Sequence, residues 1–326
     1  MFSSGEFFQR IRKDYYRSLF PVLLSVILAA FSAASGFGGE PVPVPDFSGD
    51  RAMELLIAQC DLGPRTPGSA GNRQLRKMIL DLARKNGFKA RTLCFDATDP
   101  MTGEPVQVCN IVVSVGMHPE NRLWLGAHYD TRPVCDRDSD PELRSTPLTG
   151  ANDGASGVAV LLHLMEILGE NPPAQGVDFL FFDGEDSGLS GDPGGFCLGS
   201  RQLAATCRDF GNPLSQGTPR GLIVLDMVGK KNLQIPMEAY SLVNAPEWTE
   251  SVFDRAQQLG LTAFVKHRGP AIYDDHAPFL EIGIPAVDLI DFDFPQWHTT
   301  GDTPETCSAS SLDEVGRLML DLIYQP

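Results

Sequence analysis

The hydrophobic positions of this chain follow two periods, and the alternation between them predicts an α/β protein. Apolar residues recur at helical spacing between residues 75 and 86, and a second helix is expected at 246–259. Short, almost continuous apolar runs at 177–182, 222–225 and 286–290 are typical of strands that helices cover on both faces. The pattern therefore predicts strands and helices arranged around one sheet.

A further helix is expected where the segment from Asp153 to Ser156 opens an apolar stripe that closes near Gly169. The remaining expected elements are strands at 110–115 and 122–127 and a last helix at about 312–324. No internal repeat and no second linker interrupts this part of the sequence. We therefore expect a single globular α/β domain over residues 50–326, with a central, twisted, mostly parallel mixed sheet flanked by helices.

The first forty residues have a different pattern. Basic residues precede an apolar run from Leu19 to Ala33, which ends in small side chains. This arrangement is typical of a secretory signal peptide, and an uncleaved N-terminal anchor is the alternative. We assign residues 1–34 to a signal peptide or anchor and the Pro- and Gly-rich stretch 35–49 to a linker. The protein is thus expected to be exported, periplasmic or secreted, and to touch a membrane only through that segment.

Composition and charge exclude several classes of function. The chain has 326 residues, of which 42% are hydrophobic, so it can bury a core and is not expected to be disordered. A formal net charge of −16 disfavours binding to nucleic acid. The seven cysteines contain no C-x-x-C pair, which argues against a thiolate zinc site and leaves any disulfide pairing open. We expect a monomer with neutral or cationic partners.

Acidic and imidazole side chains follow the predicted strands at the points where these strands end. The set consists of His128, Asp130, Glu185, Asp186, Asp226 and His298. Each alone is more commonly a helix cap or a solvated charge. The carboxyl ends of strands form the ligand crevice of open α/β sheets, however, and carboxylates that converge there need a cation, a proton or a basic partner. A mixed carboxylate and imidazole set without thiolates suits a catalytic zinc.

Glu185 and Asp186 are consecutive residues that leave one predicted strand, so their side chains point in different directions. One can bind a metal while its neighbour faces the substrate and transfers a proton. A turn with solvated charges is the alternative for this corner taken alone.

Five segments resemble, in order, the co-catalytic zinc aminopeptidase superfamily. They are GAHYD at 126–130, GANDGASG at 150–157, FFDGED at 181–186, LDMVG at 225–229 and WHT at 297–299. Three features are more similar to the zinc-type glutaminyl-peptide cyclotransferases of animals and bacteria. A long excursion follows the acidic corner at 187–201, Tyr273 opens a motif with a doubled acid before its His, and Trp297 directly precedes His298.

The resemblance implies roles for particular residues. One zinc would be held by Asp153, Asp186 and His298. The catalytic carboxylates would be Glu185, as general base and acid, with Asp226 and Asp274 in a hydrogen-bonded acidic network. The substrate would be contacted by Trp297, Phe294 and Tyr273, with simple core packing as the alternative for Trp297.

Some positions depart from the family pattern or keep a second interpretation open. Asp186 stands where glutamate is the commoner ligand, and Gly191 stands where some animal enzymes have an aromatic residue. His128 and Asp226 correspond to ligands of a second zinc in the aminopeptidases, so a second metal is the alternative to a hydrogen-bonded, structural His128. His276 is expected to be a structural or network residue.

The activity implied by the resemblance is the conversion of an N-terminal glutamine of peptides or proteins into pyroglutamate with release of ammonia, using one Zn²⁺ per chain. A two-zinc aminopeptidase of the same superfamily and a non-catalytic binding domain are the alternatives. In the aminopeptidase Glu185 would activate water, whereas a binding domain would have no need of this residue.

Overall fold

The computed structural model describes residues 43–116, 120–189, 191–210 and 219–326, and Val44–Pro326 form one compact unit. The expected signal peptide or anchor at residues 1–34 lies outside the described residues. None of the helices in the described part of the chain is long and apolar enough to cross a membrane.

The ordered domain begins slightly before residue 50. Phe47 is buried, and an added Cβ at Gly316 would lie only 2.4 Å from its ring, so the two segments are in close contact. Ser48 caps helix α2 (Gly49–Cys60), because its hydroxyl oxygen accepts a hydrogen bond from the Arg51 N–H. The last residues of the expected linker therefore belong to the folded unit.

A six-stranded mixed sheet with the order β1-β2-β4-β3-β5-β8 forms the centre of the domain. The strands are β1 (Lys89–Thr98), β2 (Pro105–Val115), β3 (Leu123–His128), β4 (Val177–Phe182), β5 (Gly221–Asp226) and β8 (Ala286–Ile290). The last four run parallel to one another, whereas β1 and β2 pair antiparallel at one edge. This confirms the expected α/β fold with a central, mostly parallel sheet.

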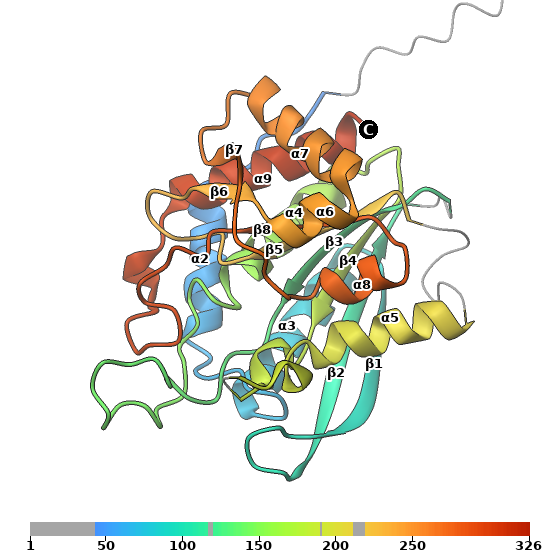
Figure 1. Ribbon diagram of the computed structural model, residues 1–326. Helices are drawn as coiled ribbons and strands as arrows, with labels where there is room; N and C mark the ends of the chain where they lie inside the picture. The colour runs from blue at the N-terminus through green and yellow to red at the C-terminus, as the bar shows by residue number, and fades with distance from the viewer. Residues whose placement is uncertain (1–42, 117–119, 190, 211–218) are drawn as a thin grey trace, which may run out of the picture. The chain divides into compact units, whose positions relative to one another are not determined.

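Helices cover both faces of the sheet (Figure 1). One face packs against α2, α3 (Ala70–Lys85), α4 (Ser156–Glu170), α7 (Pro246–Gln258) and α9 (Ala309–Tyr324), and the other packs against α5 (Leu198–Phe210) and α8 (Ala277–Glu281). Along β4, Phe179 and Phe181 point into the first core and Leu180 and Phe182 into the second. Burial on both faces explains the apolar run of this strand, which only Asp178 interrupts.

Several elements were not predicted from the sequence. They are β1, α2, α5, α8, the short helix α6 (Ala239–Asn244) and a separate two-stranded sheet of β6 (Ile235–Met237) and β7 (Phe264–Arg268). β1 lies at the sheet edge and alternates exposed with half-buried positions, which weakens its hydrophobic signal. A disulfide joins Cys94 of β1 to Cys109 of β2, a pairing that the sequence had left open.

Candidate active site

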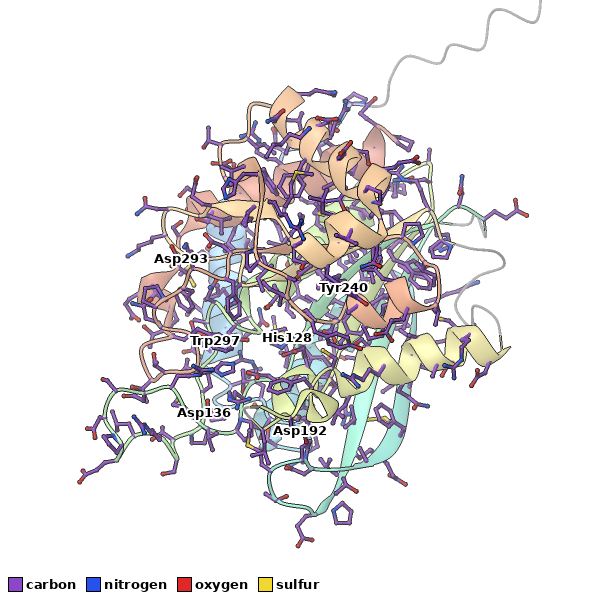
Figure 2. The ribbon with its side chains drawn as sticks, viewed as in Figure 1. His128, Asp136, Asp192, Tyr240, Asp293 and Trp297 are labelled. Carbon is purple, nitrogen blue, oxygen red and sulfur yellow. A yellow bond between two sulfur atoms is a disulfide. The ribbon has the colours of Figure 1, made fainter. Side chains whose placement is uncertain are left out.

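The polar residues that follow the predicted strands meet at the carboxyl edge of the parallel strands. His128 ends β3 and Asp226 ends β5, while Glu185 and Asp186 begin a short 3₁₀ turn just after β4. Neighbouring parallel strands end on the same side, which brings these residues together. In Figure 2, His128 lies near the middle of the view, between the labelled Trp297 and Tyr240.

Asp153, Asp186 and His298 form a candidate ligand set that could hold a metal ion. Each offers one ligand atom within 4.8 Å of the others, and all three side chains are buried. His298 Nε2 lies 3.3 Å from Asp186 Oδ1 and 3.6 Å from Asp153 Oδ2. Within the described residues, Asp153 Oδ2 and Asp186 Oδ2 are buried without a hydrogen-bond partner. Such oxygens beside a histidine nitrogen are satisfied by a divalent cation, so the residues fit a zinc ion.

Two further buried carboxylates hold the loops that carry these ligands. Asp302 accepts hydrogen bonds from the N–H groups of residues 152–153, at 2.8 and 3.1 Å. Asp130 accepts from the N–H groups of residues 185–186, at 3.1 and 3.2 Å. Gly154 allows close packing, since a Cβ there would lie 2.4 Å from the Asp130 carbonyl oxygen. Asp130 thus fixes the backbone that carries Glu185 and Asp186.

Asp136, which the sequence analysis missed, orients His298. Its Oδ1 lies 3.4 Å from His298 Nδ1, which leaves Nε2 facing the two carboxylates. Arg132 donates two hydrogen bonds to Asp136, at 2.8 and 2.7 Å, and one to Asp186 Oδ1, at 3.0 Å. The sequence did contain a signal that could have pointed to Asp136. Arg132 is the lone cation among the acidic motifs, and a buried arginine needs a carboxylate nearby.

The charges around His298 change its protonation. Burial by itself lowers the pKa of His298, but the charge of Asp186 and the hydrogen bond with Asp136 outweigh it and raise the pKa to about 9. A cation that binds Nε2 therefore has to displace a proton at neutral pH.

His128 lies between two carboxylates of the site. Its Nε2 is 3.1 Å from Asp226 Oδ1 and 3.3 Å from Asp153 Oδ1. His128, Asp153 and Asp226 also bring three ligand atoms within 4.8 Å of one another, so Asp153 belongs to two possible ligand sets. The sequence had left open whether His128 binds a second metal or is a hydrogen-bonded, structural residue, and the geometry accommodates both.

The acidic network differs in detail from the expectation. Among the described residues no hydrogen bond joins Asp226 to Asp274, because Asp226 Oδ1 pairs with His128 and Asp274 Oδ1 accepts from the Asp275 N–H. The two carboxyls still interact, since burial and then the charge of Asp226 raise the pKa of Asp274 to about 7. Burial, followed by the charge of Asp274, raises the pKa of Glu185 well above its ordinary value. These carboxyls are therefore suited to hold and transfer protons.

A pocket of about 300 Å³ opens in front of this set. Its polar lining consists of Asp153, Glu185, Asp186, Asp226, Asp274 and His298, and its aromatic lining of Phe196, Tyr273, Phe292 and Trp297. The Trp297 ring lies against the His298 ring, with centroids 3.9 Å apart, and 4.8 Å from that of Phe292. Trp297 is therefore part of the pocket wall beside the ligand set.

Phe294 does not line the pocket as the resemblance had implied. It packs with Met227 and Ile290 and is only 6% exposed, and its carbonyl accepts a hydrogen bond from the Trp297 N–H. Phe292 lines the wall in its place. Gly191 also lines the pocket. Phe196, in the same segment 187–201, contributes an aromatic ring to the lining.

An α/β sheet with a candidate Asp/Asp/His ligand set and an adjacent half-buried glutamate at its carboxyl edge is typical of a metal-dependent enzyme. The family comparison agrees with this class. The model of Peptidase family M28 matches residues 110–323, and the chain belongs to this family.

Similar proteins include both cyclases and peptidases. The Bos taurus "Glutaminyl-peptide cyclotransferase-like protein" is 26% identical over 295 residues, which cover 78% of this chain and 70% of that protein. A Bacteroides thetaiotaomicron glutaminyl cyclase, solved with bound N-acetylhistamine, is 31% identical, with a TM-score of 0.81 and 87% and 100% of the two chains covered. A leucine aminopeptidase precursor from the same organism is 32% identical, with a TM-score of 0.81 and 87% and 99% covered. These findings confirm the resemblance to glutaminyl cyclases within the zinc aminopeptidase superfamily.

Proposed function

We propose that this protein is a glutaminyl-peptide cyclotransferase, which converts the N-terminal glutamine of a peptide or protein into pyroglutamate and releases ammonia. The observation that carries the proposal is the position of Glu185, a carboxyl with a raised pKa, beside the Asp153, Asp186 and His298 set in a small aromatic-walled pocket. Such a pocket suits one terminal side chain rather than a length of chain. The cyclotransferase names of the relatives support the same assignment.

Glu185 would serve as both base and acid. Asp153, Asp186 and His298 would hold a zinc ion, which would supply Lewis acidity toward the side-chain carbonyl oxygen of the substrate. Glu185 accepts a proton from the α-amine as the amine nitrogen forms a bond to the side-chain carbonyl carbon. It then returns the proton to the amide nitrogen, whose bond to that carbon breaks, so that ammonia leaves. The raised pKa of Glu185 suits it to carry the proton between these steps.

The walls of the pocket contribute by orientation. Both reacting groups belong to one residue, so holding that residue folded back supplies much of the rate enhancement by proximity. Trp297, Phe292 and Phe196 would exclude water from the substrate side chain and restrict its conformation. Tyr273 and Asp274 border the same space and are proposed to contact the substrate and assist the proton transfer.

We infer that the site holds one zinc, with His128 as a hydrogen-bonded partner of Asp226. The contact of 3.1 Å between His128 Nε2 and Asp226 Oδ1 supports this assignment. The competing function is a two-zinc aminopeptidase, in which His128, Asp153 and Asp226 would bind a second ion.

We also propose a cellular location, an oligomeric state and a domain organisation for this enzyme. We infer an exported, monomeric enzyme with residues 1–34 as signal peptide or anchor, followed by a short linker that ends where the compact catalytic domain Val44–Pro326 begins. The disulfide between Cys94 and Cys109 supports an oxidising compartment.

The test compares two substrates with the purified, zinc-loaded protein. A peptide that begins with glutamine is expected to lose ammonia and yield a blocked N-terminus, detected by a coupled ammonia assay and by mass spectrometry. An amino-acid anilide is expected to release no anilide, and the protein is expected to contain close to one zinc per chain. Anilide release together with two bound zincs would replace the cyclase assignment with the aminopeptidase.

A further inference from the structure

Cys197 is a buried cysteine beside the carboxyl of Glu185. Its Sγ lies 3.5 Å from Glu185 Oε1, a hydrogen-bonding distance for a thiol donor. The Cys197 side chain is buried and forms no disulfide, and it is not among the described residues that line the catalytic pocket. Glu185 does line the pocket. The thiol therefore contacts this carboxyl from within the protein rather than from the pocket.

Backbone hydrogen bonds fix the position of this thiol relative to Glu185. The Cys197 N–H donates to the Glu185 carbonyl oxygen at 2.8 Å, and the Leu198 N–H donates to the Gly184 carbonyl oxygen at 3.1 Å. The acidic corner and the start of α5 are therefore joined through two consecutive residues on each side. Because of this pairing, the backbone of Cys197 is held beside that of Glu185.

Cys197 also adopts a backbone conformation that favours glycine. Its φ is +57°, in the left-handed region, although the residue has a side chain. The start of α5 supports this conformation, because the Cys197 carbonyl oxygen accepts hydrogen bonds from the Ser200 hydroxyl at 3.2 Å and the Arg201 N–H at 3.0 Å. Non-glycine residues that are held in such conformations gather at functional sites.

The Cys197 thiol is a hydrogen-bond donor because it stays protonated. Burial, and then the charge of Glu185, raises the pKa of Cys197 well above its ordinary value. A protonated thiol can donate to the carboxylate, whereas a thiolate would repel it. The raised pKa also opposes a role as metal ligand, since metals bind the thiolate, even though ligand atoms of Glu185, Cys197 and Asp274 lie within 4.8 Å of one another.

From these contacts we propose that Cys197 is a positioning residue for the proton transfer by Glu185. Its S–H group holds Oε1 of the carboxyl, so that Oε2 is directed toward the substrate amine and then toward the departing nitrogen. Among the described residues, no other side chain donates a hydrogen bond to this carboxyl. The proposal rests on the proposed function, although Glu185 would also be the base in the alternative aminopeptidase.

The first experiment measures kcat, KM and zinc content of Cys197→Ala and Cys197→Ser with a peptide that begins with glutamine. Cys197→Ala is expected to keep its zinc and to lower kcat roughly 5- to 30-fold with little change in KM, because orientation of the base acts in the transition state. Cys197→Ser keeps a donor and is expected to recover much of the lost kcat. A residue that served for apolar packing alone would only be disturbed by the buried hydroxyl.

Cys207→Ala is the matched control. Cys207 is a buried cysteine of the same helix α5, and it packs in the core against the sheet. The substitution removes the same thiol from a position without contact to Glu185, and kcat is expected to stay at the wild-type value.

Two further measurements determine whether Cys197 acts through Glu185. In a Glu185→Gln background, Cys197→Ala is expected to lower the residual kcat by less than about twofold, because the carboxylate that it orients is already absent. Infrared difference spectra of wild type minus Cys197→Ala are expected to show an S–H stretching band at the lowered frequency of a hydrogen-bonded thiol. Glu185→Gln is expected to move this band toward higher frequency, because an amide oxygen is a weaker acceptor than a carboxylate.

An unchanged kcat in Cys197→Ala would overturn the proposal, and so would a full further loss in the Glu185→Gln background. Loss of zinc from a folded Cys197→Ala protein would overturn it as well, because Cys197 would then belong to the metal site. If Cys197→Ala does not fold, the S–H band of the wild type decides, and a free-thiol frequency counts against the proposal. A wild type that releases no ammonia would refute the cyclase function, whereas anilide release and the infrared band would still test the role of Cys197.

Discussion

Replacing Asp136 by asparagine tests whether the residue that orients His298 governs the affinity for zinc. The asparagine would keep the size of the side chain but lose its charge. Burial alone would raise the pKa of Asp136, but its hydrogen bonds with His298 and Arg132 hold that pKa well below the usual range, so the native carboxylate is ionised at neutral pH. The variant removes a charged acceptor 3.4 Å from His298 Nδ1.

The expected magnitude follows from that contact. Losing the partner of a ligand histidine typically weakens metal binding by about 10- to 100-fold, or about 1.4 to 2.7 kcal/mol. Arg132 keeps its hydrogen bond to Asp186 Oδ1, so the ligand set is expected to persist. Turnover of D136N is therefore expected to fall at limiting zinc and to recover largely when zinc is in excess.

The assay is a zinc competition titration against a chromogenic chelator, with ammonia release measured across the same zinc series. Asp140→Asn is the control, because Asp140 is exposed and its carboxylate accepts a hydrogen bond from the nearby Glu142 N–H, away from the ligand set. A D136N protein that folds and binds zinc as tightly as the wild type would refute the orienting role of Asp136.

Three further predictions address the base, the second ligand set and stability. Glu185→Gln is expected to retain zinc while turnover falls by about 10² or more, because the variant cannot accept the proton; near wild-type turnover would assign the base to another residue. His128→Ala is expected to leave the zinc content near one per chain, as measured by elemental analysis, whereas loss of one of two zincs would favour the aminopeptidase. Burial and then the charge of Asp130 raise the pKa of Asp183 to about 7, so the folded protein keeps a proton that the unfolded chain releases near pH 4. The stability that this proton contributes is complete below about pH 4 and is lost as the pH rises to about 7. Denaturant titrations of Asp183→Asn are expected to show a smaller fall in the free energy of unfolding between pH 5 and 7 than titrations of the wild type. An equal fall would contradict the assignment.

The elements that could be predicted from the sequence are those with a strong local signal. The run 177–182 is apolar at nearly every position because β4 is buried on both faces, and the predicted bounds match the strand. The strand 286–290 was predicted for the same reason. β1 and β7 lack such a signal, since exposed residues dominate both, and only their pairing partners stabilise them as strands.

The residues of the candidate site also fall into two groups, those that the sequence indicated and those that only the structure revealed. The sequence itself indicated the polar side chains of the candidate site, because carboxylates and histidines at the ends of apolar parallel strands converge on one edge of the sheet. It could not determine which residues support or border them. Asp136 reaches His298 from a distant part of the sequence, and Phe292 rather than Phe294 lines the pocket.

The tertiary structure also decided the pairing of Cys94 with Cys109 and the contact of Asp226 with His128. Both depend on contacts between segments that are separated in sequence. Local periodicity reports how each segment is buried, but the side chain that it meets is set only when the strands and loops are packed together.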